Sequence, residues 1–150
     1  MIVYAESSAV LAWIFQEPRA DAVNDVFDRA TLVLSSALTT IECTRGVRRA
    51  EAAGRVTARE ADTLLAELRL LADGWDAMEI GERVVLVASA PFPVEPVRSL
   101  DAIHLASAKL ASDRLGDVAV LSFDERVRAN AEALGLGVLP LTAPSASPSR

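Results

Sequence analysis

The sequence is short of cysteine, histidine and aromatic residues, and each shortage narrows what the protein can be. A single cysteine, Cys43, excludes an internal disulfide and fits a reducing compartment. With only His104 and Cys43 as nitrogen or sulfur ligands, we do not expect a zinc site. Aromatic residues are 5% of the chain and hydrophobic residues 51%, so the core must be built from aliphatic side chains. The 150 residues suffice for one domain with such a core.

Long apolar runs are also missing. No segment reaches the roughly 18 apolar residues of a membrane-spanning helix. The first fifteen residues lack the basic start, apolar stretch and cleavage site of a signal peptide, because Glu6 interrupts the apolar run. We therefore expect a cytoplasmic protein without membrane association.

The net charge of −6 argues against binding nucleic acid through bulk charge. It does not exclude a nucleic-acid substrate, since a bound divalent cation reverses the local sign. An acidic surface would also suit a basic protein partner.

Short apolar segments alternate with helical patterns along the chain. Strands are expected at residues 1–5, 31–35, 75–80, 118–122 and 138–139. Helices are expected at residues 8–15, 19–29, 38–53, 57–73, 81–90 and 99–110, and from 124 to Gly135. This alternation predicts an α/β fold of three layers, α/β/α, with a central parallel sheet of four to five strands. The domain spans 1–141, and the low-complexity residues 142–150 are expected to form a disordered tail.

Four acidic residues stand in strongly apolar surroundings, where an unpaired charge is costly. They are Glu6 after the first strand, Glu42 inside an apolar helix, Asp101 near a helix start, and Asp124 after the fourth strand. In parallel sheets the functional crevice lies at the carboxyl ends of the strands. One shared partner would explain all four acids, and an all-oxygen set favours Mg²⁺, with Mn²⁺ possible. Such an ion activates water and stabilises the leaving oxygen in phosphodiester hydrolysis. Taken singly, Asp101 and Asp124 also fit the role of helix caps.

The segments that carry these acids are residues 2–9, 36–42, 100–106 and 121–126, and together they resemble the PIN-domain ribonucleases. Their order and spacing resemble the VapC-type toxins of bacterial toxin–antitoxin systems. The resemblance implies a parallel sheet flanked by helices, with Glu6, Glu42, Asp101 and Asp124 binding one or two Mg²⁺ or Mn²⁺ ions and Ser7 assisting. It also implies an RNA substrate, a cognate antitoxin and a homodimer.

The chain departs from the family pattern at its first acid, which is usually aspartate and here is Glu6. The extra methylene moves the carboxylate by roughly 1.5 Å, a shift that an octahedral Mg²⁺ site tolerates poorly. Glu6 then binds from a displaced backbone, binds through water, or favours a more forgiving metal. This leaves open an alternative function: a catalytically weakened module that binds RNA or a protein without cleavage.

Further residues have open roles. His104 shares a helix face with Asp101 and is either a base or a core histidine with satisfied hydrogen bonds. The three arginines Arg45, Arg48 and Arg49 could hold RNA phosphates or the acids of an antitoxin, or could simply be cations near a helix end. A receiver-type phosphoryl-transfer domain usually needs a lysine at a strand end, whereas Lys109 falls in mid-helix, so this reading ranks low.

Overall fold

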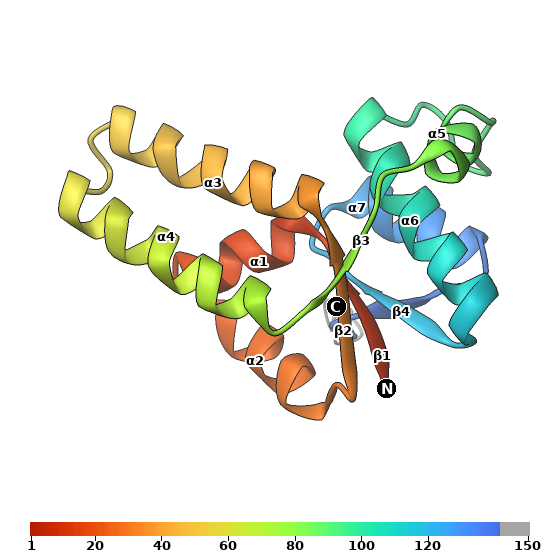
Figure 1. The fold of residues 1–150 in the computed structure, drawn as a ribbon, viewed down its shortest axis with the longest axis horizontal. Helices are drawn as coiled ribbons and strands as arrows, with labels where there is room; N and C mark the ends of the chain where they lie inside the picture. Colours follow the sequence, from red (N-terminus) through yellow and green to blue (C-terminus); the bar gives the residue numbers. More distant parts are fainter. Residues whose placement is uncertain (142–150) are drawn as a thin grey trace, which may run out of the picture.

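A five-stranded parallel sheet forms the centre of the computed structural model, which describes residues 1–141 (Figure 1). The strands are β1 (Ile2–Ala5), β2 (Leu32–Ser36), β3 (Asp76–Met78), β4 (Val118–Leu121) and β5 (Gly137–Leu139). Their order is β3-β2-β1-β4-β5, and every neighbouring pair is parallel. The prediction of a parallel sheet of four to five strands is confirmed.

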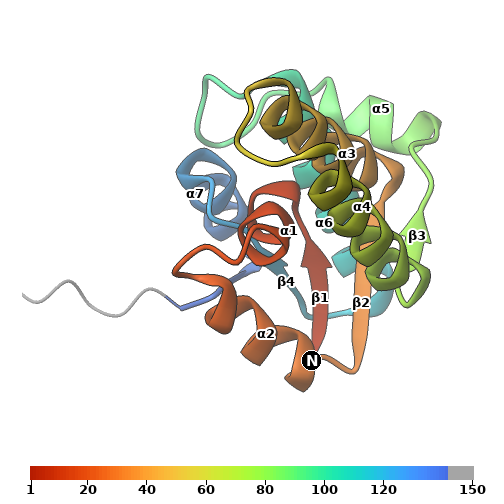
Figure 2. The same ribbon diagram turned by 90° about the vertical axis from the view of Figure 1, so that its left-hand side faces the viewer.

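Within residues 1–141, seven helices cover the two faces of this sheet. They are α1 (Ser7–Ile14), α2 (Ala20–Arg29), α3 (Ala37–Ala52), α4 (Ala58–Asp73), α5 (Glu82–Ala88), α6 (Ser99–Leu115) and α7 (Glu125–Ala133). Helices α1 to α4 lie on one side of the sheet and α5 to α7 on the other, as the views in Figures 1 and 2 show. The three-layer prediction is therefore confirmed.

Local sequence signals explain where these elements begin and end. Thr57 and Glu60 form the predicted capping box at the start of α4, with the Thr57 side chain accepting from the Glu60 N–H. Gly54 follows α3 with a φ of +67°, a conformation that glycine adopts without strain. Among the helices of residues 1–141, none combines the length and apolar character needed to cross a membrane. The predicted tail, 142–150, lies outside the described residues.

The core is aliphatic, as the composition requires. Val3, Tyr4 and Ala5 of β1 are fully buried, because β1 is the middle strand and is covered on both faces. Helix α6 packs through small side chains such as Ala102, Ala106 and Ala108, which bring the helix backbone near the sheet. This close packing places the first turn of α6 beside the carboxyl ends of β1 and β4.

Candidate active site

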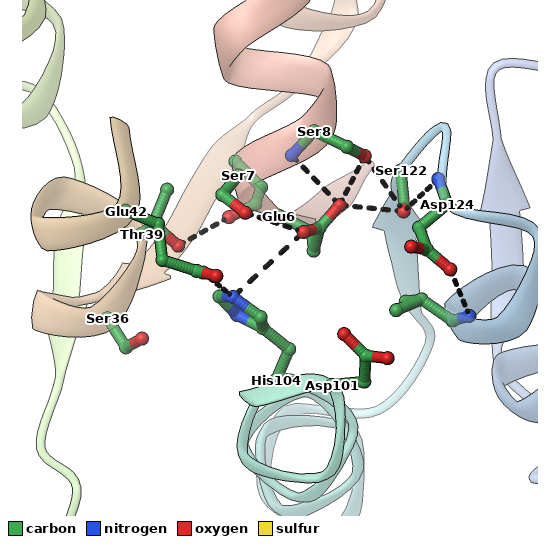
Figure 3. Close-up of polar contacts among 12 residues, drawn as sticks. Glu6, Ser7, Ser8, Ser36, Thr39, Glu42, Asp101, His104, Ser122 and Asp124 are labelled. Atoms are coloured by element: carbon green, nitrogen blue, oxygen red, sulfur yellow. Dashed lines mark hydrogen bonds and ion pairs between the residues drawn. The ribbon is translucent and has the colours of Figure 1, made fainter. Parts of the chain in front are cut away.

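The predicted acids lie where the central strands end. Glu6 follows β1 and caps α1, and Asp124 follows β4 and caps α7. The two strand ends are joined directly, since the Glu6 N–H donates to the Leu121 carbonyl at 3.0 Å. Asp101 stands in the first turn of α6 and Glu42 in α3, so four separate elements contribute one acid each (Figure 3). The topology thus brings distant parts of the sequence to one edge of the sheet.

Glu6 is 4% exposed, and its carboxylate accepts four hydrogen bonds. Its Oε1 accepts from the Ser7 hydroxyl at 2.7 Å. Its Oε2 accepts from the Ser8 N–H at 3.0 Å, from the Ser8 hydroxyl, and from the Ser122 hydroxyl at 2.7 Å. These donors compensate for the loss of water around the charge. They also fix the carboxylate so that Oε1 is its less crowded oxygen.

His104 and Glu42 complete a group around Oε1 of Glu6. The Nε2 atom of His104 lies 2.6 Å from Oε2 of Glu42 and 4.0 Å from Oε1 of Glu6. Burial raises the pKa of the Glu42 carboxyl, but the hydrogen bond and charge of His104 outweigh it and hold that pKa below its ordinary value. We call Glu6, Glu42 and His104 the Glu6 cluster.

Tyr4 supports His104 from the core side. The Tyr4 hydroxyl lies 3.0 Å from Nδ1 of His104 and donates to the Ser36 hydroxyl at 3.3 Å. Burial raises the pKa of Tyr4 to about 12, so the phenol keeps its proton at neutral pH. His104 is 1% exposed, which fits the buried, hydrogen-bonded histidine considered from the sequence, yet its outer nitrogen faces the acids.

Asp101 and Asp124 share a different partner, Arg98. Its guanidinium binds Asp101 through Nε at 2.7 Å and through a second nitrogen at 3.1 Å, and it reaches Asp124 at 2.6 Å. Asp124 also accepts from the N–H groups of Arg126 and Val127 at the start of α7. We call Asp101, Asp124 and Arg98 the Arg98 cluster.

The structure therefore sorts the four acids into two groups. Glu6 and Glu42 converge with His104, while Asp101 and Asp124 are bridged by Arg98. Ser7, which was expected to assist the metal site, donates its hydroxyl to Oε1 of Glu6. Among the three arginines of α3, Arg48 pairs with Glu51 at 2.8 Å and with Asp62 at 3.8 Å.

Sequence reasoning did not single out Arg98 or Ser122. Arg98 precedes Asp101 by three residues across the N-terminus of α6, a spacing that brings two side chains together. Ser122 is fully buried, donates to Glu6 and accepts from the Asp124 N–H at 3.0 Å. Ser122 is the last residue of a predicted buried strand and comes shortly before Asp124, a predicted metal ligand. This position was the signal in the sequence that could have identified it as a site residue.

The Glu6 cluster has the donor set of a divalent cation site. One atom each from Glu6, Glu42 and His104 lies within 4.8 Å of the others, and two of the three are carboxylate oxygens. Cis ligands of an octahedral cation with bonds of about 2.1 Å are about 3 Å apart, so small side-chain movements suffice to enclose an ion. The residues present fit such a group.

Comparisons with known proteins agree with this architecture. Residues 3–133 match the family model of the PIN domain. The chain is 34% identical over 140 residues to ribonuclease VapC35 of Mycobacterium tuberculosis, covering 92% of this chain and 96% of that protein. It is 33% identical over 137 residues to ribonuclease VapC46 of the same organism, covering 91% and 95%.

Solved structures with the same fold are more distant in sequence. FitAB bound to an IR36 DNA fragment superposes with a TM-score of 0.65 at 18% identity, covering 93% of this chain and 94% of that one. VapBC2 from Rickettsia felis, bound to a promoter DNA fragment, gives 0.64 at 9% identity, covering 92% and 97%. The resemblance seen in the four acidic segments is confirmed, and the chain belongs to the PIN domain family.

Proposed function

We propose that the protein is a metal-dependent endoribonuclease, the toxin of a toxin–antitoxin pair, that hydrolyses RNA phosphodiester bonds. The observation that carries this proposal is the meeting of four acids from four elements at the carboxyl edge of the sheet. The names of its relatives, VapC35 and VapC46, support RNA as the substrate class. The cation is Mg²⁺ or Mn²⁺, since carboxylate oxygens dominate the site.

The side chains have separable tasks in this proposal. A bound divalent cation supplies Lewis acidity and lowers the pKa of water. Glu6 is held rigidly by its four donors and, with Glu42, supplies negative charge where the cation binds. Asp101 and Asp124 complete the acidic set, and a carboxylate among the four accepts the proton of the attacking water. Ser7 orients Glu6 through Oε1.

The expected partners follow from the same assignment. RNA brings phosphates to a site whose local charge is reversed by the cation, in a chain with a net charge of −6. The relation to VapC proteins favours a cognate antitoxin, a homodimer and a cytoplasmic location. Exposed apolar residues such as Ile41, Leu70 and Leu86 supply surface for such contacts.

A second candidate function is binding of RNA or a protein without cleavage. It is favoured by one observation: the acids already have partners, because Arg98 neutralises Asp101 and Asp124 while serines and His104 satisfy Glu6 and Glu42. A longer acid at the first position, Glu6 in place of aspartate, points the same way. Cleavage assays separate the two functions.

The deciding experiment treats a mixed tRNA and rRNA pool with purified protein in Mg²⁺, in Mn²⁺ and in EDTA. We expect cleavage with a cation, none with EDTA, and a loss of at least about 100-fold in Asp101→Asn, which keeps the shape of the side chain. Glu67→Gln, an exposed acid on α4, serves as the matched control and should cleave normally.

Full activity of Asp101→Asn would overturn the assignment of the acids. RNA binding without turnover in any cation would favour the second function. In that case Glu6→Asp tests the cause, because restored cleavage would show that the longer side chain disables the site.

A further inference from the structure

His104 is placed as a ligand rather than only as a core residue. Its side chain is 1% exposed, yet Nε2 is directed between the two carboxylates of the Glu6 cluster, at 2.6 Å from Glu42 and 4.0 Å from Glu6 (Figure 3). Any buried histidine needs a hydrogen-bond partner on its outer nitrogen, but here two carboxylates from different elements face that atom. The first point is therefore which ring nitrogen a cation could reach.

On the core side of the ring, Tyr4 contacts Nδ1 of His104. The Tyr4 hydroxyl donates its proton to Ser36, so its oxygen is free to accept from Nδ1–H of His104 at 3.0 Å. Tyr4 therefore occupies Nδ1, and Nε2 is the nitrogen that faces the acids, where it hydrogen-bonds to Glu42 at 2.6 Å. A cation that binds Nε2 takes the place of the proton in this hydrogen bond, and that proton is released to water. Metal-binding histidines characteristically donate their second ring N–H to a neighbouring group, which fixes the ring in this way. Tyr4 and Ser36 are that support here.

Glu6 presents one oxygen to the same point. Its Oε2 is occupied by three donors from Ser8 and Ser122, whereas Oε1 accepts only from Ser7. The cluster therefore offers Oε1 of Glu6, an oxygen of Glu42 and Nε2 of His104 to one ion. The Arg98 guanidinium already holds Asp101 and Asp124, so those acids have a cation of their own.

Building on the proposed function, we propose that His104 binds the catalytic cation directly through Nε2, and that this nitrogen makes the site prefer Mn²⁺ to Mg²⁺. Mg²⁺ demands oxygen ligands in near-ideal octahedral geometry, and it keeps several waters. An imidazole ligand suits first-row transition ions better than Mg²⁺. The longer reach of Glu6 is also better accommodated by an ion with less strict geometry.

The test uses a property of the sequence: His104 is the one histidine of the chain. Tag-free protein is loaded with Mn²⁺, and electron spin echo envelope modulation is recorded with natural histidine and with histidine labelled with ¹⁵N in its ring. We expect a ¹⁴N modulation typical of a bound imidazole that changes to the ¹⁵N pattern on labelling. This measurement needs no substitution, so it stands even if variants at His104 fail to fold.

The affinities of the protein for Mn²⁺ and Mg²⁺ are the second measurement. In His104→Gln we expect the affinity for Mn²⁺ to fall at least about 10-fold. This affinity is measured through the electron spin resonance signal of the free ion. Mg²⁺ binding, measured by competition, should weaken by less than about 3-fold. Asp113→Asn, an exposed acid on α6, is the control and should bind both ions like the natural chain.

Bound Mn²⁺ without imidazole modulation would overturn this inference, as would equal weakening of Mn²⁺ and Mg²⁺ binding in His104→Gln. Failure to bind Mn²⁺ would also overturn it. RNA cleavage in Mg²⁺, measured on the same preparations, tests the proposed function separately. Cleavage without the imidazole signal would support the nuclease function and refute the role of His104 as a ligand. The imidazole signal without cleavage would support the role of His104 and refute the nuclease function.

Discussion

The Glu6 cluster and the Arg98 cluster solve the same electrostatic problem in different ways. Each holds two acids at the carboxyl edge of the sheet, where burial makes charge expensive. The Arg98 cluster contains a permanent cation, with a side chain that is 57% exposed. The Glu6 cluster relies on hydroxyl and imidazole hydrogen bonds and has no permanent cation among the described residues. The site is thus divided into a part that Arg98 already neutralises and a part at which we propose that a cation binds.

The largest expected effect concerns which of the two clusters binds the cation. In Glu42→Gln a ligand charge of the Glu6 cluster is removed, and we expect Mn²⁺ affinity to fall about 100-fold, near 2.7 kcal/mol. In Asp124→Asn the charge removed is already paired with Arg98, so affinity should fall by less than about 3-fold, even though cleavage is lost. Isothermal titration calorimetry of both variants measures the difference. Equal losses in the two variants would remove the distinction between the clusters.

A second effect tests the link between the clusters, which is Ser122. Its hydroxyl donates to Glu6 and accepts from the Asp124 N–H. Ser122→Ala therefore removes one of the four hydrogen bonds of Glu6 and takes away the hydroxyl that accepts from the Asp124 N–H. Loss of such a buried hydroxyl should lower the free energy of unfolding by about 2 kcal/mol. Urea denaturation measures this loss.

Ser89→Ala is the matched control for that change. Ser89 is exposed on the end of α5 and donates to one carbonyl, that of Val85, within its own helix. The expected change is below about 0.5 kcal/mol. If both alanine variants unfold at the same urea concentration as the natural chain, the Ser122 link contributes no stability.

The fold was predictable because its signals are local. Apolar runs such as residues 118–122 predict buried strands, and the Thr57 capping box predicts the start of a helix, without knowledge of distant residues. The α/β alternation then restricts the topology to a parallel sheet with helices on both faces. The structure agrees at each of these points.

The division of the acids was not predictable in the same way. Sequence alone placed Glu6, Asp101 and Asp124 near one edge, because strand ends and helix starts meet there. Glu42 was added to them because of its apolar surroundings and the family resemblance. It could not show that Arg98 turns toward both aspartates, since that depends on rotamers and on the approach of α6 to α7. His104 had two open readings for the same reason. Its helix face was known from its spacing to Asp101, but its neighbours across the sheet, Tyr4 and Glu42, were not.

The smallest expected effect is that of replacing Arg98, the permanent cation. This substitution compares the two clusters most directly, because it removes the charge that distinguishes them. In Arg98→Gln the charges of Asp101 and Asp124 are no longer neutralised, so cation affinity should rise. The side chain is 57% exposed, and solvent screening limits the gain to about 1 kcal/mol, or about 5-fold. Arg83→Gln, an exposed arginine on α5, is the control and should change nothing. Calorimetric stoichiometry then decides what Arg98 does. A rise from one to two Mn²⁺ per chain would mean that the guanidinium takes the place of a second cation, whereas one Mn²⁺ at unchanged affinity would mean that the Arg98 cluster only holds α6 against α7.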